Sequence, residues 1–303
     1  MNQMGTATIS CLLAMAIVTP CAADGGPSGE PTVEARIDSI GSYGASVQLS
    51  IASAPQEFAI TDTSVKEALK TVEAGDTIKV AIDQSTTPNQ LKRLTVVSHS
   101  LGLGQRMLFL ALAAAFVFAM AALVVRGSPL RFLVGVDGRY SNSQFQIALW
   151  FYSVMTVYLA TMAARIWVGG LEFLGGVEIP TNLLALSGLS ALTFGAAKAI
   201  TAQKVDNLAA GAVCLKTSSA TARFPDDLVR NDLGAVDIGD FQMLFITILA
   251  VIIHVSMTVH FLGSIALVLH VTLPDVDSTL LSGFGLGQGA YLIKKAASRL
   301  GEG

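Results

Sequence analysis

The sequence predicts a membrane protein of α-helices with a small all-β domain at its N-terminal end. Two observations carry this prediction. Of the 303 residues, 52% are hydrophobic and only 14% are charged, whereas soluble domains carry about 25% charged residues. Several apolar runs approach the roughly 20 residues that a membrane-spanning helix needs, and residues 32–100 instead alternate between polar and apolar. The net charge of −3 excludes a strongly basic nucleic-acid binder.

The first 31 residues have the pattern of an export signal and a linker. The apolar run at 11–18 is too short to span a bilayer, and small residues follow at Cys21-Ala22-Ala23. We therefore expect a signal peptide over 1–23, although Met1–Ser10 contains no Lys or Arg. Lipidation of Cys21 is the alternative, which Pro20 disfavours. Residues 24–31 form a linker rich in Gly, Pro and Ser.

Residues 32–100 predict a small β domain, which a cleaved export signal would place in the periplasm. The expected elements, in order, are strands at Thr32–Ile40, Ala45–Ala52 and Gln56–Thr61, a helix at Val65–Val72 opened by a Ser64–Glu67 capping box, and strands at Thr77–Asp83 and Leu91–Ser98. This order is similar to an OB-fold. Residues 31–100 hold eight acids, six bases and two aromatic residues. Because nucleic-acid binding needs cations and stacking surfaces, we expect no nucleic-acid partner.

Five apolar segments predict about five transmembrane helices. They lie at 107–125 (within a first helix at 105–127), 145–168, 182–200, 241–262 and 278–293, the last being short and rich in glycine. With the β domain outside, the inner segments hold eleven Lys and Arg residues and the outer loops at 169–180 and 263–277 hold none. This asymmetry predicts a periplasmic β domain, a cytoplasmic linker at 201–231, and a cytoplasmic tail at 298–303 in a bacterial inner membrane.

Two segments, 137–200 and 232–297, resemble each other and predict an internal duplication. Matching residues stay 94 to 97 positions apart, from Phe145-Gln146 and Phe241-Gln242 to Lys198-Ala199 and Lys295-Ala296. Each unit holds two spans, so we expect two copies that face the same way, related by an axis along the membrane normal. Small residues favour close helix packing, here predicted at Gly188, Gly195, Gly283, Gly285, Gly287 and Gly289.

The repeat also carries a resemblance. Gly-Arg-Tyr-Ser-Asn-Ser-Gln-Phe-Gln-Ile-Ala-Leu-Trp at 138–150 and Ile-Pro-x-x-Leu-Leu-x-Leu-x-Gly-Leu-Ser at 179–190 resemble a family of uncharacterised bacterial multi-pass inner-membrane proteins. The resemblance covers about half the chain. It implies a topology and no activity.

Five side chains form the candidate polar site in the membrane: His254, Gln146, Gln242, Lys198 and Lys295. His254 is the ionisable group deepest in a span, and such residues are functional candidates by default. The matched glutamines and lysines lie near the cytoplasmic interface, where two Lys could bind an anionic lipid head group. The simpler alternatives are a buried histidine bonded to a neighbouring helix and ordinary interfacial anchors. Capping boxes are expected at Ser141–Gln144 and Asp237–Asp240.

The sequence offers no nucleophile with a base and no paired intramembrane carboxylates, so we expect no enzyme activity, no catalytic residue, no metal and no cofactor. The preferred hypothesis is a structural, scaffolding or protein-interaction role. The expected partners are membrane lipid and either a second copy of the chain or another membrane or periplasmic protein. The alternative is a homo-oligomeric channel or transporter with a shared pore. His254 should face a lumen in a transporter and lie buried between helices in a scaffold.

Overall fold

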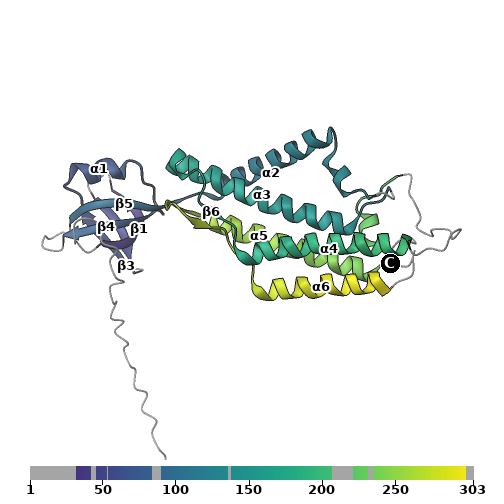
Figure 1. The fold of residues 1–303 in the computed structure, drawn as a ribbon. Coiled ribbons are helices and arrows are strands. Elements are labelled where there is room, and N and C mark those ends of the chain that lie inside the picture. Colours follow the sequence, from purple (N-terminus) through teal and green to yellow (C-terminus); the bar gives the residue numbers. More distant parts are fainter. Residues whose placement is uncertain are drawn as a thin grey trace, which may run out of the picture.

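The computed structural model describes seven stretches of the chain, and the predicted signal peptide, the linker after it, Cys21, Cys214 and the predicted C-terminal tail lie outside them. The described residues are 32–41, 46–52, 54–83, 90–135, 138–206, 221–230 and 235–297. A small β domain sits at one end of an elongated helix bundle (Figure 1). We call this the barrel end of the bundle, and the opposite one the far end.

The β domain is a sheet that closes on itself. Its elements are β1 (Thr32–Ile40), β2 (Ser46–Ile51), β3 (Ala54–Ala59), α1 (Thr63–Leu69), β4 (Thr77–Asp83) and β5 (Gln90–Ser100). The strands lie in the order β3-β2-β1-β4-β5, and a parallel contact of Ala59 with Gln90 joins β3 to β5. Alternate residues such as Ile37, Val47 and Phe58 point inward and are at most 1% exposed. This is the period-two burial that the sequence predicts.

Helix α1 corrects one predicted cap. Asp62, not Ser64, is the N-cap, and its carboxylate accepts a hydrogen bond of 2.8 Å from the Ser64 backbone N–H. The helix therefore begins at Thr63, two residues before the predicted start. The Asp62 carboxylate already bonds both the N–H and the hydroxyl of Ser64, so that hydroxyl is not available as the cap.

The described part of the bundle holds five long helices. They are α2 (Leu103–Val125), α3 (Asn142–Gly169), α4 (Thr181–Asp206), α5 (Ile238–Phe261) and α6 (Ser278–Ala297), with short 3₁₀ helices η2 (Pro129–Leu133) and η4 (Asp226–Val229) before α3 and α5. The first four are long and apolar enough to cross a membrane, whereas α6 is not among the helices that meet this criterion. Helix α4 continues to Asp206, into the stretch predicted as a linker.

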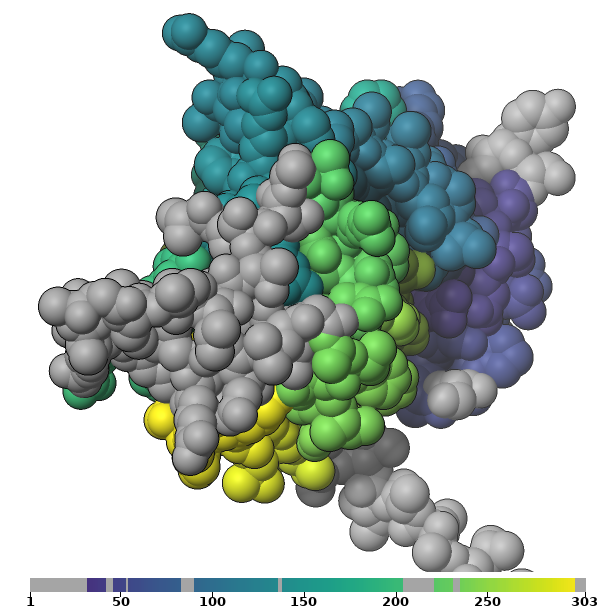
Figure 2. Space-filling model, turned by 90° about the vertical axis from the view of Figure 1, so that its right-hand side faces the viewer, coloured from purple at the N-terminus to yellow at the C-terminus, as the bar shows by residue number. Residues whose placement is uncertain are grey.

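Helix α2 is the least buried member of the bundle. Only Leu110 and Ala113 are buried, while Phe116, Leu123 and Val124 are 57%, 71% and 70% exposed. The C-terminal half of α2 projects away from α5 and α6, as the view onto the far end shows (Figure 2). In a bilayer this apolar surface is suited to lipid contact.

The loops at the barrel end contain short strands that the sequence does not predict. They are β6 (Val177–Glu178), β7 (Ser264–Ala266) and β8 (Val271–Thr272). β6 pairs in parallel with β8, and β7 pairs antiparallel with β5, so the sheet of the β domain continues into the loop between α5 and α6. Strands of two or three residues are too short to show an alternating pattern. Gly176, just before β6, has a φ of +63°, and a Cβ added there would lie 1.9 Å from the Leu269 carbonyl oxygen. Glycine has no Cβ and therefore allows the chain to pass this close to Leu269.

Candidate functional site

A polar cavity of about 290 Å³ lies at the far end of the bundle. The chain before α3, η4 with the residue after it, the start of α5 and the last turns of α4 and α6 line it. Its charged lining residues are Arg139, Lys198, Arg230, Lys295, Asp227 and Asp240. Two of the cations lie beside carboxylates, since Arg139 Nε is 3.6 Å from Asp227 and Arg230 Nε is 2.7 Å from Asp226.

The structure brings the two predicted lysines to this one cavity. Lys198 lies 5.6 Å from the centre of the Phe194 ring, and Lys295 lies 5.6 Å from the centre of the Tyr291 ring. Each ammonium thus packs over the aromatic ring one turn earlier on its own helix, a contact of about 0.5–1 kcal/mol at exposed sites. The cavity has the cations and hydroxyl groups that anionic ligands require.

Ser141 and Asp237 are the N-cap residues of α3 and α5, as predicted, but only the Asp237 side chain makes capping bonds. Asp237 accepts hydrogen bonds from the backbone N–H groups of Gly239 and Asp240, at 2.8 and 3.2 Å, and pairs with Lys294. Burial acts to raise the pKa of Asp237, but the bonds from Lys294 and from the two N–H groups outweigh it, so the pKa is lowered. Ser141 makes no capping bond, because its hydroxyl lies 3.2 Å from the Ser143 hydroxyl instead.

A ladder of buried polar side chains leads from the cavity into the bundle along successive turns of α3. Asn142, which lines the cavity, donates to the Asp240 carbonyl at 2.9 Å. Gln146, one turn further, accepts a 2.6 Å bond from Gln288 of α6. Trp150, one turn further again, has its ring centre 6.4 Å from that of His254 on α5.

Several polar atoms of this ladder have no hydrogen-bond partner in the described part of the chain. They are Asn142 Oδ1, Gln146 Nε2, Gln288 Oε1, Trp150 Nε1 and both ring nitrogens of His254. The five side chains are at most 8% exposed, and His254 is 0% exposed. A buried donor or acceptor without a partner costs about 1–3 kcal/mol. Gln288 was missed by sequence reasoning, because it lies in a glycine-rich run that we interpreted as packing.

The remaining predicted residues lie elsewhere. Gln242, the repeat partner of Gln146, is exposed and outside the ladder. A Cβ added at Gly188, Gly195, Gly283 or Gly289 would meet no atom of the chain within 4 Å, so these glycines make no close helix contact within the described chain. At Gly285 and Gly287 it would meet Leu189 at 3.8 Å and Ile246 at 3.4 Å, which are ordinary packing distances.

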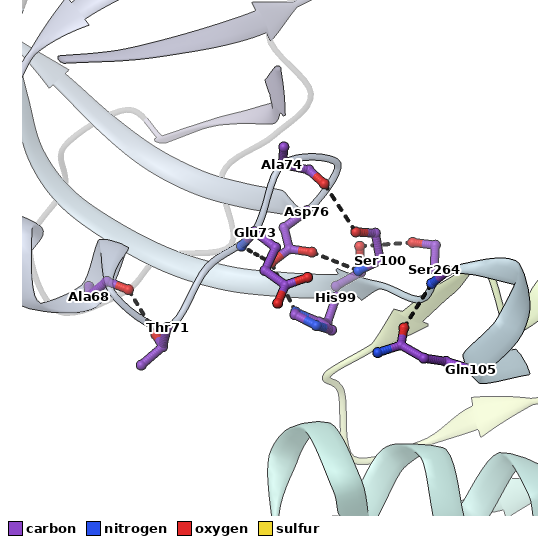
Figure 3. Close-up of polar contacts among 11 residues, drawn as sticks. Ala68, Thr71, Glu73, Ala74, Asp76, His99, Ser100, Gln105 and Ser264 are labelled. Carbon is purple, nitrogen blue, oxygen red and sulfur yellow. Dashed lines mark hydrogen bonds and ion pairs between the residues drawn. The ribbon is translucent and has the colours of Figure 1, made fainter. Parts of the chain in front are cut away.

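A second polar cluster, which the sequence did not predict, lies at the end of β5, where the β domain meets the bundle (Figure 3). Asp76 is 0% exposed and accepts bonds from the backbone N–H groups of Glu73 (2.9 Å) and Ser100 (2.6 Å). Its carboxylate also lies 2.9 Å from His99 Nδ1. Next to it, the hydroxyl of Ser264 in β7 donates to the hydroxyl of Ser98 in β5 at 2.9 Å.

Two arginines donate to backbone carbonyls near the loop that carries β7. Arg165, at the end of α3, is 1% exposed and donates to the carbonyls of Val268 and Leu269 at 2.7 and 3.2 Å. Arg106, at the start of α2, donates to the carbonyls of Leu101 and Val259 at 2.7 and 3.3 Å. Arg165 thus supplies donors to carbonyls of the loop, whereas Arg106 links the start of α2 to the last turn of α5.

Comparison with known proteins finds no matching family model, no matching curated protein and no matching solved structure. The resemblance to a family of uncharacterised inner-membrane proteins therefore stays a prediction.

Proposed function

We propose that this chain is an integral membrane scaffold that holds its β domain in a fixed position outside the membrane for contact with another protein or a second copy. One observation carries the proposal: the sheet of the β domain continues into the bundle through the pairing of β5 with β7, in which Ser98, His99 and Ser100 lie opposite Ala266, Ile265 and Ser264. A β domain attached by a flexible linker would not need strand pairing with the bundle.

The packing around this joint supports a rigid attachment. Only two residues, Leu101 and Gly102, separate β5 from α2. Leu101 is 2% exposed and packs in one apolar cluster with Leu262, Ile265 and Leu110, which come from the loop and from α2. Hydrophobic burial and strand pairing therefore act on the same short segment, and this favours one orientation of the domain.

The position of His254 also favours the scaffold over a transporter with a shared pore. The side chain is 0% exposed and lies beside Trp150 within one chain. A residue that lines a pore between subunits should be exposed in the single chain. We also propose that the chain has no enzyme activity.

Two finer features belong to the proposal. The closing contact of β3 with β5, with α1 between β3 and β4, supports an OB-like β domain. The internal duplication is supported by pairs of equal contacts: the bridges Val134–Tyr140 and Arg230–Val236 are 96 residues apart, and Val177 pairs in parallel with Val271, its counterpart at an offset of 94. A parallel pairing of equivalent residues suits two copies related by an axis along the strands.

The topology and partners complete the proposal. We place the β domain in the periplasm of a bacterium, the far end of the bundle and the C-terminus in the cytoplasm, and α6 as a fifth membrane helix packed against α4 and α5. Lipid contacts the exposed apolar faces of α2 and α5, on which Phe116, Phe245 and Ile252 are 57%, 57% and 56% exposed. The alternative of a transporter is favoured by one observation, the polar ladder on α3, which lies inside a single chain.

Native mass spectrometry of the full chain in nanodiscs tests the scaffold, together with flux assays in liposomes over a panel of ions and pH gradients. The proposal expects a defined oligomer or a stoichiometric complex and no flux. Ile265→Asp places a charge in the buried joint and should reduce the assembled fraction, whereas Leu269→Asp, at a position 70% exposed in the same loop, should not. A monomer that conducts a solute would contradict the proposal.

A further inference from the structure

The interior between α3, α5 and α6 contains several polar side chains that are buried. Going inward from the far end, it presents an amide at Asn142, an amide pair at Gln146 and Gln288, and then the Trp150 indole beside the His254 imidazole. The three positions on α3 are spaced by single helical turns, while α6 supplies Gln288 and α5 supplies the imidazole from across the bundle.

The unpartnered atoms on this ladder are both donors and acceptors. Gln146 Nε2 and Trp150 Nε1 carry hydrogens to donate, and Gln288 Oε1 and Asn142 Oδ1 accept. A neutral imidazole has one donor and one acceptor nitrogen, and neither nitrogen of His254 has a partner in the described residues. Buried water makes about three hydrogen bonds to groups of this kind. Water, which both donates and accepts hydrogen bonds, is therefore a ligand suited to this set.

We propose that this interior binds a chain of water molecules that connects the polar cavity at the far end with His254, and that His254 takes up a proton through it. The ligands are water and the proton. In the protonation step, a hydrated proton arriving along the water chain binds the lone pair of the unprotonated ring nitrogen, and the imidazole becomes an imidazolium. This inference does not depend on the proposed scaffold role, because it concerns the interior of a single chain.

The charged groups around His254 lie at the two ends of the bundle. Helix α3 carries no charged residue between Asn142 and Arg165, α5 none except His254 between Asp240 and His260, α4 none before Lys198, and α6 none before Lys294. The other titratable groups of these helices between their charged ends are the phenols of Tyr152 and Tyr158 on α3 and of Tyr291 on α6, and Tyr152 donates to the Ala114 carbonyl at 3.0 Å. Water is thus the group available to solvate a charge on His254.

Exchange of the C2 hydrogen of histidine for deuterium, followed by mass spectrometry, tests this directly. The exchange needs water at the ring, and its rate follows the protonation of the ring as pH changes. With the full chain in nanodiscs, we expect His254 to exchange with a sigmoidal pH profile, at a rate comparable to that of His260, which is exposed on the same helix. This wild-type measurement needs no variant to fold.

A matched pair of variants locates the path. Gln146→Leu blocks the ladder, and we expect it to slow His254 exchange by about tenfold or more, which corresponds to about 1.4 kcal/mol of added cost for water to reach the ring. Gln242→Leu makes the same change at the repeat-matched exposed position and should leave His254 unchanged. No exchange of His254 while His260 exchanges would overturn the water chain, and equal rates in both variants would overturn its route past Gln146.

Discussion

Asp76 and His254 are both 0% exposed, yet these two ionisable groups differ in their hydrogen-bond partners. Asp76, at the junction, has partners from Glu73, His99 and Ser100. His254, in the bundle, has two ring nitrogens without a partner among the described residues. A fully bonded buried polar group fixes one structure, whereas an incompletely bonded one leaves sites for a ligand. The difference agrees with the rigid junction and the water-binding interior that we propose.

The largest expected effect on stability comes from removing the carboxylate of Asp76, the fully bonded group of the two. Asp76→Ala should destabilise the chain by about 3 kcal/mol or more, because it leaves two backbone N–H groups of the junction without their charged acceptor. Thermal unfolding in detergent measures it. The control is Asp38→Ala, because Asp38 is exposed on β1 and bonds only to Ser50 at 2.8 Å among the contacts described. A melting temperature equal to that of the control would show that the junction does not depend on Asp76.

The next effect concerns Arg165. Arg165→Leu removes the donor of two loop carbonyls and should cost about 2 kcal/mol. The loss should appear as faster backbone hydrogen exchange in residues 264–270, with the core of the β domain unaffected. Arg131→Leu changes an exposed arginine in η2 and serves as the control. Protection of 264–270 that is equal in both variants would mean that strand pairing alone holds the loop.

A smaller effect is expected at Asp237, and it depends on pH. Asp237→Ala should cost about 1 kcal/mol, the usual value of a helix N-cap, whereas Ser141→Ala at the matching position should cost much less because Ser141 makes no capping bond. Since the pKa of Asp237 is lowered in the folded chain, its stabilisation is present above the unfolded pKa and is lost as pH falls through the folded value. The wild type and Asp237→Ala should therefore converge in stability only as pH falls below 3.8, the ordinary pKa of the group. A constant difference at all pH values would contradict this.

The smallest expected effect on folding concerns the glycines that face open space. Gly188→Ala and Gly283→Ala should change stability by less than about 1 kcal/mol, because an added methyl group meets nothing and alanine favours helix. Native mass spectrometry then separates two roles. Loss of an oligomer in these variants would place the glycines at a subunit interface, and an unchanged oligomer would leave them facing lipid.

Much of the architecture follows from local sequence patterns, and the links between its parts do not. Alternation fixed the bounds of β1 and β4, and apolar length located α2, α3, α4 and α5. The pairing of β7 with β5 was missed because it depends on contacts between residues more than 160 positions apart. The same reason hid the bond of Gln288 to Gln146, whereas Gln242, chosen for its repeat position, lies on the exposed face. A local sequence pattern indicates burial and periodicity, but it does not show which neighbour a polar side chain contacts.

The rigid attachment of the β domain can be tested by one distance measurement. Spin labels at Asp38→Cys on β1 and Glu172→Cys at the barrel end of the bundle, with Cys11, Cys21 and Cys214 replaced by Ser, report the distance between the two parts by pulsed electron resonance in nanodiscs. We expect a single narrow distribution that broadens when Arg165→Leu is added. A broad distribution before any change at the junction would contradict the scaffold.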